Sequence, residues 1–201
     1  MRNLAVLLVL AVSATPSEKT STNVAKGWVL DGPGAAYSFH VDMAEKHGGR
    51  ASGLIECTTP DVDDFGVLTQ LIKADAYRGR RVRLSSYLRT RGIEDGSARM
   101  WMRVDGPEVS PMAMDNMAKR AIHGDTEWAR YDIVLDLPAD AVRIAFGVIL
   151  GGQGRLWVDD LAFDFVDGKV ASTDMHVPPD PFKTVVPADL PGRPINPGFE
   201  D

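Results

Sequence analysis

The sequence lacks the cysteines of a disulfide-stabilised protein and the long apolar runs of a membrane protein. Cys57 is the only cysteine in 201 residues, so no internal disulfide can form and a packed core must supply the stability. The compact apolar run Leu4–Val12 is too short to span a bilayer, which takes roughly 20 apolar residues. We therefore expect one globular domain without a transmembrane segment.

Recognisable catalytic motifs are absent as well. The sequence contains no nucleophile elbow, phosphate-binding loop or metal-ligand cluster, and its 4 histidines lack zinc-ligand spacing. A non-catalytic protein that requires no cofactor is therefore favoured. A hydrolase is an alternative, because a site assembled by folding leaves no linear motif and His123 and Asp115 share one long connection.

The charge balance argues against nucleic acid as a partner. The formal net charge is -6, whereas proteins that bind phosphate backbones are commonly basic. Arginines are frequent between residues 78 and 91, but the alternation places Arg83 and Arg89 on one face of a strand. Such arginines are typical of a solvated sheet face.

The N-terminus has the pattern of a signal peptide over residues 1–14. Arg2 supplies the charged segment, Leu4–Val12 the apolar segment, and Val12-Ser13-Ala14 a small-residue cleavage pattern. We therefore expect export to the periplasm or the medium. Residues 15–26 follow as a polar leader.

Short apolar runs separated by turn residues predict an all-β protein. The main domain should cover residues 27–166, and a proline-rich extended tail should follow over 167–201. A long connection at 106–126 allows a short helix at 112–119. The nine strands that we expect are 28–30, 37–43, 51–58, 66–74, 81–91, 98–105, 127–137, 143–150 and 155–166.

Three of these strands, within residues 81–137, place apolar side chains on one face and polar or aromatic ones on the other. If the three are neighbours, the polar sides combine into one concave, half-open surface. The candidate ligand-binding residues on that surface are Gln70, Tyr87, Arg89, Trp101, Arg103, Asp105 and Asn116.

An aromatic plane beside hydrogen-bonding side chains is what a sugar site needs. A carbohydrate or another cell-envelope ligand is therefore the leading hypothesis, and recognition of a protein partner is the alternative. The same residues also allow an internal role, in which Arg103 and Asp105 pair beneath the long connection and Trp101 packs against its methionines.

Asp159 is in phase with Trp157, Leu161, Phe163 and Phe165 in the strand at 155–166. A carboxylate in an apolar stripe needs a cation, an arginine or backbone N–H groups, unless the strand end is uncovered. A structural tie is favoured over a catalytic role.

Several strings resemble the closing strands of galactose-binding-like jelly rolls, a superfamily that includes carbohydrate-binding modules. They are Trp128 with Tyr131, then Val134–Pro138, the run IAFGVIL at 144–150 and WVDDLAF at 157–163. Three further strings are similar to a family of exported bacterial domains without an agreed activity: 77–90, 100–106 and 115–124. The resemblance implies an antiparallel β-sandwich of the jelly-roll type and assigns no ligand or catalytic residue.

The resemblance also implies a structural calcium ion. Strings like NPGFE, here at 196–200, open many carbohydrate-binding modules, where their acidic side chain helps to hold calcium. In this chain the string comes last, so it predicts either a docked final strand or the truncated entrance to another module. Asp159 is the candidate metal ligand, because such jelly rolls often place calcium between their last and first strands.

Overall fold

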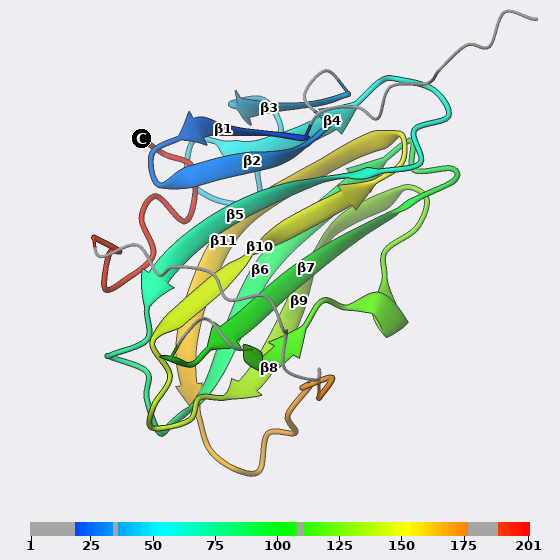
Figure 1. Ribbon diagram of the computed structural model, residues 1–201. Helices are drawn as coiled ribbons and strands as arrows, with labels where there is room; N and C mark the ends of the chain where they lie inside the picture. The colour runs from blue at the N-terminus through cyan, green and yellow to red at the C-terminus, as the bar shows by residue number, and fades with distance from the viewer. Residues whose placement is uncertain (1–18, 34–35, 108–110, 177–188) are drawn as a thin grey trace, which may run out of the picture.

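A computed structural model of the chain describes residues 19–33, 36–107, 111–176 and 189–201. The predicted signal peptide lies outside these residues. The strands form two packed antiparallel sheets (Figure 1). This architecture confirms the predicted β-sandwich.

The six-stranded sheet has the order β1-β2-β5-β10-β7-β8, and the five-stranded sheet has the order β3-β4-β11-β6-β9. The nine expected strands are all present, with ends shifted by a few residues at most. The bounds are β1 Lys19–Ala25, β2 Trp28–Pro33, β3 Tyr37–Asp42, β4 Ser52–Cys57, β5 Phe65–Lys73, β6 Arg81–Arg91, β7 Ser97–Asp105, β8 Pro111–Asp115, β9 Thr126–Asp136, β10 Arg143–Gly151 and β11 Gly154–Val166.

Two strands, β1 and β8, were not predicted from the sequence. β1 lies in the expected polar leader, where the sequence KTSTNVA has no apolar alternation, and it pairs with β2 at a sheet edge. β8 covers the first half of residues 112–119, where the sequence allowed a short helix. Only Ala118–Arg120 is helical there, as one short 3-10 turn. Neither strand needs an apolar face of its own, because each adds to the edge of an existing sheet.

The core lies between the sheets and is built from the inward side of each alternating strand. Leu84 of β6, Met102 of β7, Phe146 of β10 and Val158 of β11 are all fully buried there. Each of these strands therefore has a second face that points away from the core. Among the described residues no helix is long and apolar enough to cross a membrane.

The three strands within residues 81–137 are not all neighbours, so the condition for one combined surface is not met. β6 pairs with β9 and β11, whereas β7 pairs with β10 and β8 in the other sheet. The turn between β6 and β7 therefore carries the chain from one sheet to the other. As a result, the outward faces of β6 and β7 lie on opposite sides of the molecule.

The apolar stripe of β11 is also divided. Asp159 lies opposite Tyr87 on β6, but Ala162 lies opposite Ser85, so β11 contains one extra residue at a bulge. Asp160 takes up the bulge with a φ of 50°. The bulge reverses the phase of the strand, so Trp157 faces outward, while Leu161 and Phe163 pack on the core.

The C-terminal residues dock on the sandwich without forming a strand. Phe199 is 1% exposed and stacks on Trp28 with 5.1 Å between the ring centroids. The Trp28 indole N–H donates to the carbonyl of Asn196, and the Leu161 N–H donates to the carbonyl of Pro197. Glu200 accepts from the backbone N–H and from Nε of Arg50. The NPGFE string thus docks on the sandwich but does not form the predicted strand, and we call residues 195–201 the C-terminal clasp.

Candidate functional site

The predicted set is divided between the two outer faces of the sandwich. Tyr87 and Arg89 lie on the five-stranded sheet, and Trp101, Arg103 and Asp105 lie on the six-stranded sheet. One surface that contains all of them therefore does not exist. Each half has to be judged by what already occupies it.

On the five-stranded sheet, the loop of residues 43–51 packs on the candidate residues Tyr87 and Arg89. His47 stacks on Tyr87 with 3.5 Å between the ring centroids and an interplanar angle of 11°. Glu45 forms an ion pair with Arg89, whose guanidinium also lies over the ring of Trp157. Tyr87 and Arg89 thus hold this loop on the sheet, so the ring of Tyr87 is covered by His47 and the guanidinium group of Arg89 is already paired.

Asp159 fastens the same loop. Its Oδ2 accepts from the backbone N–H groups of His47 and Gly48 at 2.9 and 3.0 Å, and its Oδ1 accepts from the Asp160 N–H at 2.7 Å. Burial raises the pKa of the Asp159 carboxyl, while these hydrogen bonds oppose the rise. The expectation of a structural tie is confirmed, and backbone N–H groups make it.

The residues around Asp159 do not form a set of free oxygen ligands. Both of its carboxylate oxygens accept hydrogen bonds, and the two oxygens of nearby Glu200 are held by Arg50. Among the described residues no group of three or more His, Cys, Asp or Glu side chains could hold a metal. Calcium takes about 6–8 oxygen ligands, and the described residues around Asp159 do not offer such a set. Calcium binding is therefore still an untested prediction.

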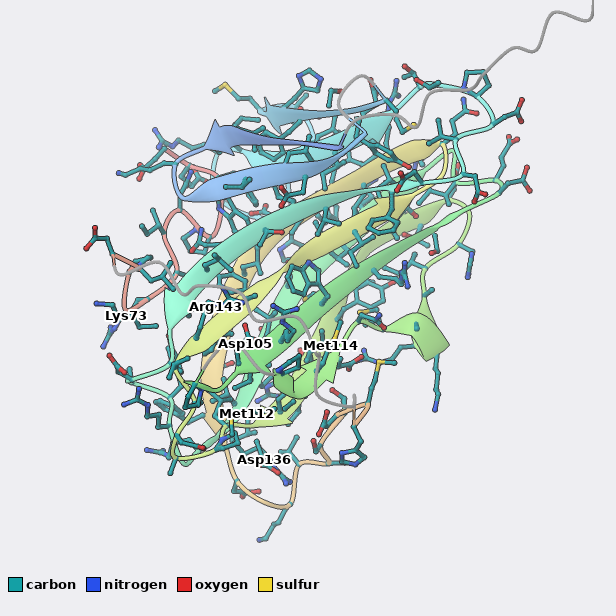
Figure 2. The ribbon with its side chains drawn as sticks, in the orientation of Figure 1. Lys73, Asp105, Met112, Met114, Asp136 and Arg143 are labelled. Atoms are coloured by element: carbon teal, nitrogen blue, oxygen red, sulfur yellow. The ribbon has the colours of Figure 1, made fainter. Side chains whose placement is uncertain are left out.

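On the six-stranded sheet, a row of charged side chains crosses three strands. Lys73 of β5 lies opposite Arg143 of β10, which lies opposite Asp105 of β7. Figure 2 shows these residues on the front of the sheet, with Met112 and Met114 of the β8 segment beside them. Arg103 lies on the same face of β7, two residues before Asp105. We call Lys73, Arg143, Asp105 and Arg103 the cationic row.

Asp105 is the centre of this row, and it is 0% exposed. Nε of Arg143 donates to its Oδ2 at 2.8 Å, and Nε of Arg103 lies 2.9 Å from its Oδ1. The side chain of Arg143 is 5% exposed and that of Arg103 is 29% exposed. The predicted pairing of Arg103 with Asp105 is therefore confirmed, and the two guanidinium groups share one carboxylate.

Sequence reasoning missed Arg143, which opens a strand that was noted for its apolar run. The signal was present: an arginine directly before IAFGVIL must face outward if Ile144 and Phe146 face the core. Lys73 was missed in the same way at the end of β5. Only the strand register places Arg143 beside Asp105 and Lys73 beside Arg143.

Trp101 lies two residues from Arg103 on the outer face of β7, opposite Gly147 of β10. A Cβ atom at Gly147 would clash with the carbonyl oxygen of Leu68, so glycine is required at this position. Position 147 of β10 therefore has no side chain opposite the Trp101 indole. The outward residues of β10 on either side of Gly147 are the small Ala145 and the partly exposed Ile149. Trp101 is partly exposed, but its Nε1 is buried and has no hydrogen-bond partner among the described residues.

Two candidates have other roles. Gln70 is 2% exposed and fastens the C-terminal clasp: its Nε2 donates to the Ile195 carbonyl, and its Oε1 accepts from the Ile195 N–H. Its side chain follows the core phase of β5 between Leu68 and Ile72, which explains the error. The Asn116 side chain accepts from the Ala118 N–H and shapes the turn after β8.

Asp115 and His123, the residue pair of the hydrolase alternative, are not in contact in the described part of the chain. Asp115 is buried and pairs with Arg120, while His123 contacts the carbonyl of Gly96. The geometry therefore gives no support to that acid-base pair.

No protein-family model matches the sequence. A curated relative, the uncharacterised helix-turn-helix-type transcriptional regulator YbfP of Bacillus subtilis (strain 168), is 39% identical over 178 residues. The match covers 88% of this chain and 57% of the regulator, so the chain spans little more than half of that relative's length.

Solved structures resemble this sandwich at low sequence identity. The CBM22-1 xylan-binding domain from Paenibacillus barcinonensis has a TM-score of 0.51 and 10% identity, over 78% of this chain and 99% of that domain. A Stig cyclase from Fischerella sp. TAU has a TM-score of 0.52 and 11% identity, over 77% of this chain and 92% of the cyclase.

The enzymatically active domain of tailspike protein 4 from bacteriophage CBA120 has a TM-score of 0.55 and 14% identity, over 70% of this chain and 19% of that one. At these identities the likeness shows the fold alone, and that fold is shared by binding modules and enzymes. The chain is thus a jelly-roll sandwich like those of carbohydrate-binding modules.

Proposed function

We propose that this chain is a non-catalytic, exported binding module that takes a carbohydrate on the outer face of its six-stranded sheet. Trp101 carries the proposal, because its ring is partly exposed on this face, whereas His47 stacks on the ring of Tyr87, the other aromatic residue of the predicted set. An indole plane can stack on the apolar face of a pyranose while neighbouring guanidinium groups donate to hydroxyls.

The two outer faces differ in a way that favours this choice. On the five-stranded sheet, Tyr87 is covered by His47, and Arg89 is paired with Glu45. On the six-stranded sheet, Gly147 of β10 lies opposite Trp101, and Arg103 keeps part of its surface exposed. Among the described residues, no ring stacks on Trp101 as His47 stacks on Tyr87.

The relative from Bacillus subtilis supports a second use for the same module. The match covers 88% of a chain whose described residues contain strands and one 3-10 turn, whereas a helix-turn-helix motif needs two helices. We infer that the shared part is the sandwich, and that in a regulator it would sense a ligand. Both uses require a binding face and differ in cellular compartment.

Glycan-array binding by the full chain tests the proposal. Trp101→Ala should abolish or strongly reduce the array signal, because the stacking plane is lost. Trp128→Ala is the matched control, since Trp128 is on the opposite sheet and touches His47, and it should bind as the parent does. An array without signal, from protein with an unchanged circular dichroism spectrum, would refute carbohydrate binding and leave recognition of a protein partner.

Export is tested separately by fractionating cells of a bacterium that expresses the full chain. Mass spectrometry should find the exported form beginning near Thr15, after the Val12-Ser13-Ala14 pattern. A form that stays in the cytoplasm and retains Met1 would contradict export and would favour the intracellular sensing role.

A further inference from the structure

The cationic row has more positive charge than its own residues neutralise. Lys73, Arg143 and Arg103 carry three positive charges around the one carboxylate of Asp105. The chain as a whole has a net charge of -6, so this local excess runs against the overall balance. An excess of one sign in one place attracts a ligand of the other sign.

The arrangement is unfavourable without an added anion. Lys73 and Arg143 lie directly opposite each other on neighbouring strands, and like charges in that position destabilise a sheet. Arg143 is nearly buried, and its carboxylate partner is shared with Arg103. Lys73 has no ion pair in the described part of the chain. A second anion here would relieve the repulsion and pair with groups that lack a full partner.

The groups around the row suit an acidic sugar better than a free ion. Trp101 lies two residues from Arg103 on the same face, with its ring partly exposed and its indole nitrogen buried. Met112 and Met114 add partly exposed apolar surface on the same side (Figure 2). A free anion would use only the charges, whereas a sugar that carries an oxyanion would also use the ring and the apolar surface.

We infer that the carbohydrate bound by this face is acidic, with an oxyanion held by Lys73 and the guanidinium groups of the cationic row and the sugar ring placed against Trp101. This inference rests on the proposed function and specifies the class of its ligand. Carboxylate, sulfate and phosphate share the required chemistry, because the planar guanidinium group binds such oxyanions in the same way.

The test is an array that pairs acidic glycans with neutral ones of the same length, for example trigalacturonate with galactotriose. The acidic member should bind at least about tenfold more tightly, as a charge-assisted contact predicts, and its advantage should shrink at high salt. Comparing carboxylated, sulfated and phosphorylated glycans identifies the oxyanion. Inorganic phosphate tests whether the charge alone is enough.

Lys73→Gln should weaken binding of the best acidic glycan about tenfold, because it removes one cation without emptying the core. Lys169→Gln is the matched control, with the same change of charge at an exposed position after β11. Equal affinity of the two variants would overturn the inference. Equal binding of acidic and neutral glycans, or phosphate binding as tight as the glycan, would also overturn it while leaving a ligand site in place. No glycan binding at all would refute the proposed function itself.

Discussion

Phe199 packs over Gly53, so the effect of Gly53→Ala on the free energy of unfolding should depend on whether the Phe199 ring is present. A Cβ added at Gly53 of β4 would lie 2.9 Å from Cε1 and from Cζ of the Phe199 ring, closer than real Cβ atoms come. The ring cannot move away easily, because Trp28 and Phe39 hold its other sides at centroid distances of 5.1 and 5.7 Å. Gly53→Ala should therefore lower the free energy of unfolding by about 1–3 kcal/mol.

Phe199→Ala should lower the same free energy by about 3–5 kcal/mol, as expected for an aromatic side chain that is 1% exposed. In that background the ring is gone, so the alanine at position 53 has room. It also reduces the freedom of the unfolded chain, which is worth about 0.4–1 kcal/mol. Gly53→Ala should then be neutral or stabilising, and the coupling between the two sites should be at least about 1 kcal/mol.

Urea unfolding of the four proteins, followed by tryptophan fluorescence, measures this cycle. Met43→Ala is the control, because Met43 is 71% exposed and its loss should change stability by less than about 0.5 kcal/mol. If the effects of Gly53→Ala and Phe199→Ala add within about 0.5 kcal/mol, the C-terminal clasp is not packed on β4 as described, and the reasoning is refuted.

Three further predictions concern charged groups. Asp105→Asn should lower the free energy of unfolding by about 3 kcal/mol in urea, because it leaves two guanidinium groups without a buried anion; a loss below about 1 kcal/mol would contradict the shared ion pair. The backbone N–H of Arg50, more than its guanidinium, lowers the pKa of Glu200 despite the opposing effect of desolvation. This contribution to the stability of the clasp should be complete above the usual pKa of about 4.5 and should fade as the pH falls through the lowered value. Hydrogen exchange of the C-terminal peptide should then speed up in acid, and Glu200→Gln should remove that dependence. Because Asp159 already accepts three backbone hydrogen bonds, melting temperatures with calcium and with a chelator should coincide, and a lower value with the chelator would demonstrate a bound ion.

The strands that pack on the core were predictable because alternation is a local property. Leu84, Met102 and Ile133 alternate with polar residues, and each is fully buried where the pattern puts an apolar side chain. β1 was not predictable in this way, since its polar sequence pairs at an edge where no apolar face is needed. The bulge at Asp160 was equally hidden, because one extra residue changes the phase without changing the composition.

The predicted site residues were half right for a related reason. Alternation placed Tyr87, Arg89, Trp101, Arg103 and Asp105 on outward faces, but it could not say which strands are neighbours. Two strands that follow each other in the chain pair in one sheet or cross to the other depending on contacts with distant segments. β6 and β7 cross, so the expected concave face became two separate faces.

The sequence by itself therefore determined an all-β sandwich and the outward side of each strand, because the side-chain period of a strand depends only on its own residues. The tertiary structure decided what meets on those sides. The register placed Arg143 between Lys73 and Asp105, and the loop of residues 43–51 covered Tyr87 while Trp101 stayed partly exposed. Those contacts join residues far apart in the chain, and only the pairing of whole strands fixes them.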